Sequence, residues 1–88
     1  DKVVGLMEKL SLTVQIPALE GTYNFIVPGN MLIRDAQKLM VKILSSEYGI
    51  SEYDEDVMLL DMAYHAVLKE DESFENLGIT NGTKLLML

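Results

Sequence analysis

The residue types that could carry chemistry in this chain are one histidine, two acidic triplets and a few serines. His65 is the only histidine and the chain has no cysteine, which excludes a thiolate nucleophile and a thiolate metal site. His65 follows Tyr64 in a predicted hairpin turn, and most acidic residues stand in distant loops. We therefore interpret His65 as a surface turn residue and not as a metal ligand or general base.

The acidic triplets Asp54-Glu55-Asp56 and Glu70-Asp71-Glu72 could attract calcium. Neither has the alternating ligands, central glycine and distal glutamate of an EF-hand loop, so we interpret both as solvated loops. No base is paired in the sequence with Ser45-Ser46 or with Ser73, and Asn81-Gly82 is not a glycine-rich loop that opens a helix. The chain is expected to have no catalytic residue, no metal and no cofactor, and to be no enzyme.

Length and charge limit the classes of partner. With 88 residues, 49% of them apolar, the chain is large enough for one core, and it contains no apolar run of membrane-spanning length. The net charge of −7 is uneven: residues 1–44 carry four acids and five bases, whereas residues 45–88 carry ten acids and two bases. Such a chain should repel nucleic acids and anionic lipids, so we expect neither nucleic acid binding nor membrane insertion.

Alternating apolar residues predict a hairpin at the start of the chain. Leu10, Leu12, Val14 and Ile16 have the period of a half-buried strand, and residues 17–21 interrupt that pattern as a loop. A second alternation of apolar residues follows, and it ends at a Pro-Gly pair; its members are Tyr23, Phe25 and Val27.

A helix and three short strands are predicted after the hairpin. Asn30 is the expected N-cap, and Gly49 offers a positive-φ exit near the end of the helix. Apolar residues at helical spacing form one face of the helix: Ile33, Ala36, Leu39, Met40, Ile43 and Leu44. The basic residues Arg34, Lys38 and Lys42 lie on the opposite face. The later strands are predicted at residues 57–60, 66–68 and 83–88. The order β-β-α-β-β-β indicates an α+β fold with the helix across one face of a mixed sheet.

The closing segment carries a resemblance to the ubiquitin-type β-grasp fold. Ile79, the Asn81-Gly82 turn, and the strand anchors Leu85 and Met87 keep the spacing of ubiquitin's own core residues. The pair Gly49-Ile50 follows the helix as a Gly-Ile pair does there. The chain more closely resembles the YukD/EsaB-like ubiquitin-fold proteins of Gram-positive type VII secretion loci. Residues 59–61, 66–68 and 74–85 carry this resemblance.

That resemblance implies a bacterial, cytoplasmic accessory or regulatory protein, peripheral to a secretion complex. The implied partner is a protein, either the membrane ATPase that drives secretion or another component of the machinery. No catalytic residues follow from the resemblance. Family members have no Gly-Gly tail after the terminal strand, so the resemblance implies that none follows Leu88.

Two alternatives remain open at this point. The chain could be a ubiquitin-like modifier or sulfur carrier whose Gly-Gly tail is absent, or a ubiquitin-like module of a larger membrane-associated protein. We expect a single domain at residues 9–88 after an N-terminal extension at residues 1–8, and the native start could be Asp1 or Met7.

The β-grasp layout predicts a protein-binding surface on the side of the sheet away from the helix. If Leu85 and Met87 face the core, then Leu86 and Leu88 face outward, because neighbouring strand residues point to opposite sides. We expect Leu59 beside them and Leu19 near the rim. Four outward leucines are typical of a docking surface. A homodimer, or cover by the apolar residues Val3, Val4 and Leu6, would also account for them.

Overall fold

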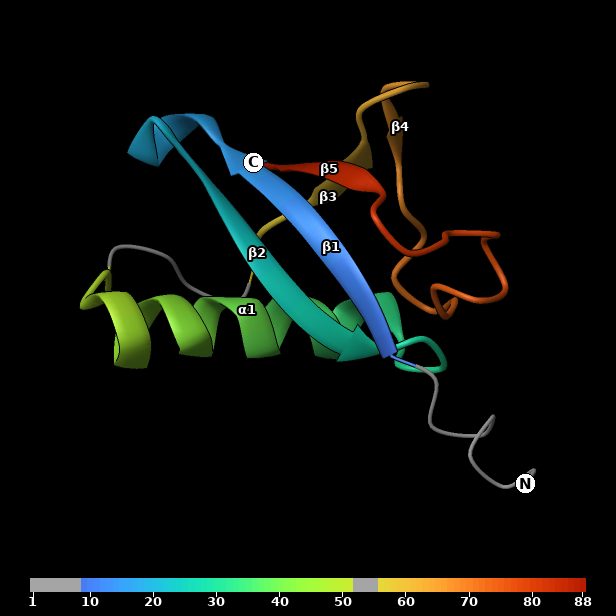
Figure 1. Cartoon of the computed structure of the whole chain (residues 1–88), viewed down its shortest axis with the longest axis horizontal. Helices are drawn as coiled ribbons and strands as arrows, with labels where there is room; N and C mark the ends of the chain where they lie inside the picture. The colour runs from blue at the N-terminus through green and yellow to red at the C-terminus, as the bar shows by residue number, and fades with distance from the viewer. Residues whose placement is uncertain (1–8, 52–55) are drawn as a thin grey trace.

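The computed structural model describes residues 9–51 and 56–88, which form one mixed sheet and one helix (Figure 1). The elements are β1 (Lys9–Ile16), β2 (Gly21–Pro28), α1 (Ile33–Tyr48), β3 (Leu59–Asp61), β4 (Ala66–Val67) and β5 (Lys84–Met87). This order confirms the predicted β-β-α-β-β-β arrangement. Residues 1–8 lie outside the described residues. The N-terminal extension, the native start at Asp1 or Met7, and the cover by Val3, Val4 and Leu6 therefore stay predictions. Asp54 and Glu55 of the first acidic triplet also lie outside the described residues.

The sheet has the strand order β2-β1-β5-β3-β4. β1 and β2 form an antiparallel hairpin, closed by a 3-10 turn at Pro17–Leu19. β5 runs parallel to β1 and antiparallel to β3, with Val14 opposite Leu85 and Leu60 opposite Leu86. The last strand of the chain therefore lies in the middle of the sheet, and α1 crosses one face of it (Figure 1).

The core lies between α1 and the sheet. Alternate residues of β1 and β5 point toward the helix and are fully buried, as period-2 alternation requires. Their main buried partners come from the helix and from the loop before β5, where Phe74 is fully enclosed. The fully buried large residues include Leu12, Ile16, Ile33, Met40, Leu44, Phe74 and Leu85.

The buried stripe of the helix differs slightly from the one predicted. Ile33, Ala36, Met40 and Leu44 are buried as expected, but Leu39 and Ile43 are only partly buried. Gln37 and Val41 are buried in their place. Near the end of the helix, the rings of Tyr23 on β2 and Tyr48 on α1 meet edge to face, with their centroids 5.0 Å apart.

The helix begins without the predicted asparagine cap. Its N-cap is Leu32, which makes no side-chain capping bond, so the prediction for Asn30 was wrong. The loop before β5 supplies the missing acceptors instead: the N–H groups of Ile33 and Arg34 donate to the carbonyl oxygens of Glu72 and Glu70, at 2.8 and 3.1 Å. A distant segment therefore satisfies donors that a local side chain would otherwise satisfy.

The helix ends at the predicted glycine. Gly49 adopts a left-handed conformation with φ of 71°, and its N–H donates to the carbonyl oxygens of Leu44 and Ser45. Ser45 and Ser46, where the sequence pattern fades, remain helical up to Tyr48. Within the described residues, no helix has the length and apolar character needed to cross a membrane.

Candidate protein-binding face

Within residues 9–51 and 56–88, no helix covers the face of the sheet away from α1, which we call the open face. Strand phase decides which residues lie on it. On β5, Leu85 and Met87 are buried while Lys84 and Leu86 point the other way. Cross-strand partners share a face, so the open-face neighbours of Leu86 are Leu60 on β3 and Gln15 on β1. The open face therefore follows from the register of the strands.

One half of this open face is apolar. Val67 on β4 lies opposite Leu60, and Leu60 lies opposite Leu86, which makes a continuous row across three strands. Met58 and Leu88 extend this row by one further pair, because each donates its N–H to the carbonyl oxygen of the other. Val67, Leu88 and Met58 have exposed fractions of 54%, 52% and 44%, and the other two are half-buried. We call these residues the apolar patch: Met58, Leu60, Val67, Leu86 and Leu88.

The predicted orientation of Leu59 was wrong, and Leu60 takes its place. Leu59 is fully buried, and it lies opposite Met87, which is itself a core residue. The residues around it are apolar in both phases, so hydrophobicity alone does not separate inside from outside. Asp61 shares the phase of Leu59, and at the strand end its carboxylate accepts the N–H groups of Ala63 and Tyr64.

The other three predicted leucines occupy different positions. Leu86 and Leu88 lie on the open face within the apolar patch. Leu19 is partly buried in the hairpin turn, where it packs against the core. The parallel pairing of Gln15 with Leu86 places this turn at the same end of the sheet as Leu88. Binding through these residues stays a prediction.

Two patch members, Met58 and Val67, had not been expected. Val67 belongs to a weak predicted strand, and only its pairing with Leu60 brings it to the open face. Met58 precedes β3 and joins the patch through its backbone bonds to Leu88, at 2.9 and 3.0 Å. The phase of Val57, which is buried, would have placed both Met58 and Leu60 outward.

The other half of the open face is polar. Its side chains are mainly hydroxyl and amide groups from β1 and β2, and the Thr13 hydroxyl donates to the Asn24 side-chain oxygen at 3.1 Å. The polar residues that are exposed or half-exposed on this half are Lys9, Ser11, Thr13, Gln15, Thr22, Asn24 and Lys84. Ile26 on β2 is an exposed apolar residue among them. The apolar patch is thus bounded on one side by polar groups, of which Lys84 on β5 is charged.

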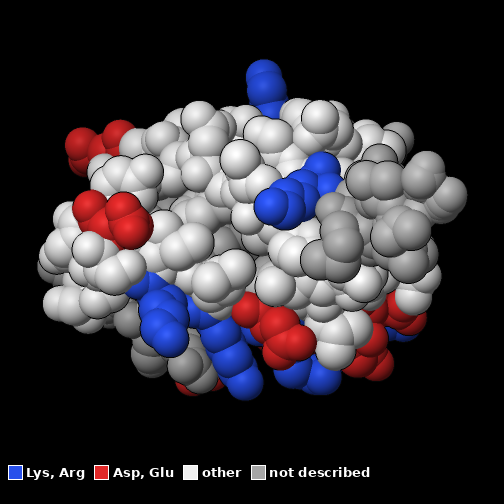
Figure 2. All heavy atoms as spheres, turned by 60° about the horizontal axis from the view of Figure 1, so that its bottom comes forward, with Lys and Arg blue, Asp and Glu red and all other residues white. Residues whose placement is uncertain are grey.

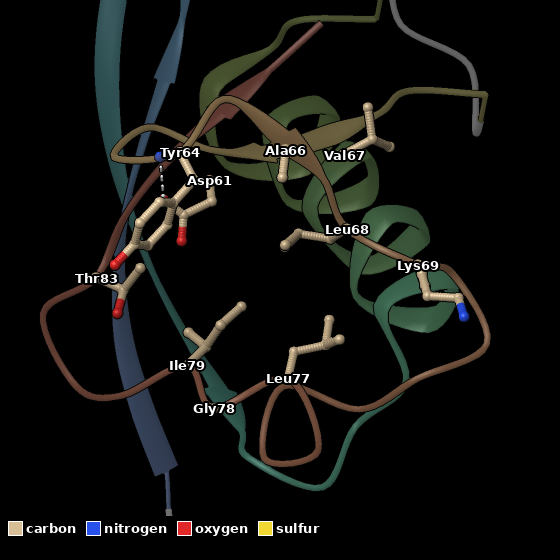
Figure 3. Close-up of a pocket in the computed structure, with 10 residues that line it drawn as sticks. All are labelled: Asp61, Tyr64, Ala66, Val67, Leu68, Lys69, Leu77, Gly78, Ile79 and Thr83. Carbon is tan, nitrogen blue, oxygen red and sulfur yellow. Dashed lines mark hydrogen bonds between the residues drawn. The ribbon is translucent and has the colours of Figure 1, made fainter.

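A hollow of about 430 Å³ lies beneath the β3–β4 hairpin (Figure 3). Leu68, Leu77 and Ile79 point into it, whereas Val67 points away from it (Figure 3). Leu68 and Ile79 are buried and form an apolar floor, and Lys69 stands at the rim. The hollow adjoins the patch through the two-residue strand β4.

The polar groups around the hollow have structural roles. The carboxylate of Asp61 is held by the turn, with its oxygen 2.7 Å from the N–H of Ala63. His65 lies in the same turn with φ of 56° and is exposed, as expected of a turn residue. Within residues 9–51 and 56–88, no group of three or more histidine, cysteine or acidic side chains could hold a metal ion.

The helix side of the molecule carries charges of both signs. Arg34, Lys38 and Lys42 are exposed along α1, with Asp35 and Glu47 on the same helix. Figure 2, turned toward this side, shows basic and acidic side chains interspersed with uncharged surface. The described residues of this side therefore present no extended field of a single charge.

The comparisons with known proteins identify the fold and no family. No protein-family model matches the chain, and no curated protein matches it. Similar solved structures include the EccD5 ubiquitin-like domain from Mycobacterium xenopi, with a TM-score of 0.73 at 11% identity over 92% of this chain and 93% of that one. The N-terminal ubiquitin-like domain of the 4931431F19Rik protein has a TM-score of 0.70 at 16% identity, with 93% and 75% of the two chains covered.

A third similar structure is the ubiquitin-like domain of the Arabidopsis thaliana protein At2g32350. Its TM-score is 0.69 at 12% identity, over 92% of this chain and 77% of that one. At identities this low, the likeness concerns the path of the backbone and not the surface. The chain has the ubiquitin-like β-grasp fold: one helix on a mixed five-stranded sheet.

Proposed function

We propose that this chain is a non-catalytic protein-interaction domain that binds a protein partner through the apolar patch. The observation that carries the proposal is the cross-strand row Val67–Leu60–Leu86, which lies on the open face with no charged residue among its members. A contiguous apolar surface bounded by polar groups is the usual composition of a protein-binding site.

The shape of the surface supports this use. The row is held on three hydrogen-bonded strands, so the side chains need little reordering when a partner binds. Removing their exposed area from water would contribute roughly 25 cal/mol per Å², before the cost of association. The hollow lined by Leu68 and Ile79 adjoins the row, and it would accept one apolar side chain of the partner.

We propose further that the partner belongs to a type VII secretion machine, in which this domain is a cytoplasmic accessory component. The resemblance of residues 59–61, 66–68 and 74–85 to YukD/EsaB-like proteins supports this role. The structural likeness to the EccD5 domain supports the same proposed role. The acidic second half of the chain would steer the domain toward a basic partner surface.

The test is an affinity pull-down from detergent-solubilised lysate of the source cell, with two matched variants. Leu60→Asp places a charge in the middle of the apolar row. Ser11→Asp places the same charge on the polar half of the same face, where Ser11 is exposed and lies opposite Ile26. We expect a membrane ATPase or another secretion component with the wild type and with Ser11→Asp, and its loss with Leu60→Asp.

Both variants should remain folded, which thermal unfolding checks. Leu60 is half-buried, so its replacement should lower the midpoint by only a few degrees, about what 1 kcal/mol produces in a domain of this size. Recovery that survives Leu60→Asp would show that the interface lies elsewhere. A ladder of covalent adducts, or no secretion component with any form of the protein, would contradict the proposed role.

A further inference from the structure

The two edges of the sheet differ greatly in length. β4, at one edge, has two residues and is followed after one residue by Lys69. β2, at the other edge, has eight residues, Gly21–Pro28, and none of them is charged. Short length and lysine are devices that keep edge strands from pairing with other chains, and β2 has neither. Figure 1 shows β2 along the outer margin of the sheet.

The backbone groups that face outward from β2 follow from the bonds of β1. The N–H of Thr13 donates to Thr83, and the carbonyl oxygen of Ser11 accepts the N–H of Gly82, so odd-numbered residues of β1 face β5. Even-numbered residues of β1 therefore face β2, where Leu12 pairs with Phe25. The backbone N–H and carbonyl groups of the odd-numbered residues of β2 bond to β1. The backbone groups of its even-numbered residues face the free edge.

Four residues of β2 thus have outward-facing backbone. Three of them, Thr22, Asn24 and Ile26, present both an N–H and a carbonyl oxygen. The fourth, Pro28, has only a carbonyl oxygen, since proline lacks the N–H. Within residues 9–51 and 56–88, no strand pairs with this side of β2.

We propose that the outer edge of β2 pairs antiparallel with β2 of a second copy of this chain, about a twofold axis at Asn24. In this register Asn24 bonds to Asn24 of the second copy in both directions, and Thr22 exchanges both bonds with Ile26. Every outward N–H of both strands then has an acceptor. The two five-stranded sheets join into one continuous sheet.

Neighbouring registers leave donors or acceptors unused. An axis at Phe25 or Ile26 brings Pro28 into the ladder, where the missing N–H leaves an acceptor of the other strand unpaired. An axis at Tyr23 pairs Ile26 with Glu20, which lies outside the strand with a left-handed φ of 55°. The axis at Asn24 uses residues 21–27 and leaves both Pro28 and Glu20 beyond the paired segment.

The side chains fit the same register. It places Tyr23 opposite Phe25 and Thr22 opposite Ile26, an aromatic pair and a β-branched pair that favour antiparallel sheets. Asn24 meets its own copy on the open face, where its oxygen accepts the Thr13 hydroxyl and its amide group can donate across the axis. Ile26, with 66% of its surface exposed, gains a partner.

Sedimentation equilibrium over a range of concentrations tests the proposal. We expect the wild-type mass to rise from the monomer value of 9.9 kDa toward twice that value as the concentration increases. Asn24→Pro removes the two central intermolecular bonds but no backbone bond to β1, because the N–H of Asn24 faces outward; it also removes the side-chain bond from the Thr13 hydroxyl. The dissociation constant of the Asn24→Pro dimer should be about tenfold or more above that of the wild-type dimer.

A second variant decides the matter if Asn24→Pro fails to fold. Asn24→Lys puts two lysines against each other at the axis, where like charges oppose pairing. Gln15→Lys is the matched control, since it adds the same charge to the exposed face of β1, one strand from the edge. We expect Asn24→Lys to be monomeric and Gln15→Lys to dimerise as the wild type does.

Amide hydrogen exchange locates the interface independently. The amides of Thr22, Asn24 and Ile26 should exchange rapidly in dilute protein and slow with increasing concentration, whereas a dimer formed through any other surface would leave them rapid. A wild type that stays monomeric at about 1 mM, or a dimer that survives both Asn24 variants, would overturn the proposal. Since the edge does not include the apolar patch, Leu60→Asp should leave dimerisation unchanged.

Discussion

Leu59 and Leu60 are chemically identical neighbours in opposite environments. Leu59 packs into the core opposite Met87, while Leu60 lies on the open face between Val67 and Leu86. The distinction matters because a residue of the first kind holds the fold together and a residue of the second kind is available to a partner. Truncating each of them should therefore have different consequences.

We expect Leu59→Ala to lower the free energy of unfolding by about 2–5 kcal/mol, because it removes a fully buried side chain and leaves a cavity. Leu60→Ala should cost about 1 kcal/mol or less, since that side chain is already half in water. Urea denaturation of the two variants beside the wild type measures both values. Equal losses would contradict the assignment of Leu60 to the open face.

The candidate site was predictable from the sequence only where one strand phase is polar. On β5, Lys84 marks the outward phase, and the positions of Leu86 and Leu88 follow from it. Around Leu59, from Val57 to Leu60, both phases are apolar, and the pairing of Leu59 with Met87 depends on a register that no local pattern encodes. Val67 joins the patch for the same non-local reason.

At the scale of elements, the two ends of α1 are capped differently, one by a neighbouring residue and the other by a distant segment. Its C-terminus is closed locally by Gly49, whereas its N-terminus is closed by carbonyl oxygens from residues 70 and 72. The first was predictable, because left-handed φ favours glycine. The second was not, because Asn30 is a good cap by type, and only the path of a distant loop decides that Leu32 stands at the cap position.

Replacing Gly49 by alanine isolates the contribution of the C-terminal cap. A Cβ at this position would meet no atom within 4 Å, so the cost comes from the positive φ of 71° and not from a clash. We expect a loss of about 1 kcal/mol in the free energy of unfolding. Ser46→Ala, on the exposed surface of the same helix, is the control and should change stability little. A Gly49→Ala protein as stable as the wild type would contradict a strained cap.

At the scale of the whole molecule, the two proposed surfaces belong to one sheet. A twofold axis at Asn24 that joins two β2 strands stands perpendicular to the sheet, so both open faces of the dimer point the same way. The two apolar patches are then separated by the strands β1 and β2 of each copy. With about 4.8 Å per strand, the two β5 strands lie roughly 24 Å apart across the dimer.

This geometry predicts avidity for partners that are themselves clustered. Wild-type protein should bind a partner immobilised at high density about 10²-fold more tightly than the same partner at low density, because the second patch binds within one complex. Asn24→Lys, whose patch is intact but whose edge is blocked, should show one affinity at both densities and match the wild type at low density. Surface plasmon resonance at two densities measures this, with Ser11→Lys, on the polar half of the open face, as the control. A density effect of equal size in Asn24→Lys would show that the avidity does not arise from pairing at β2.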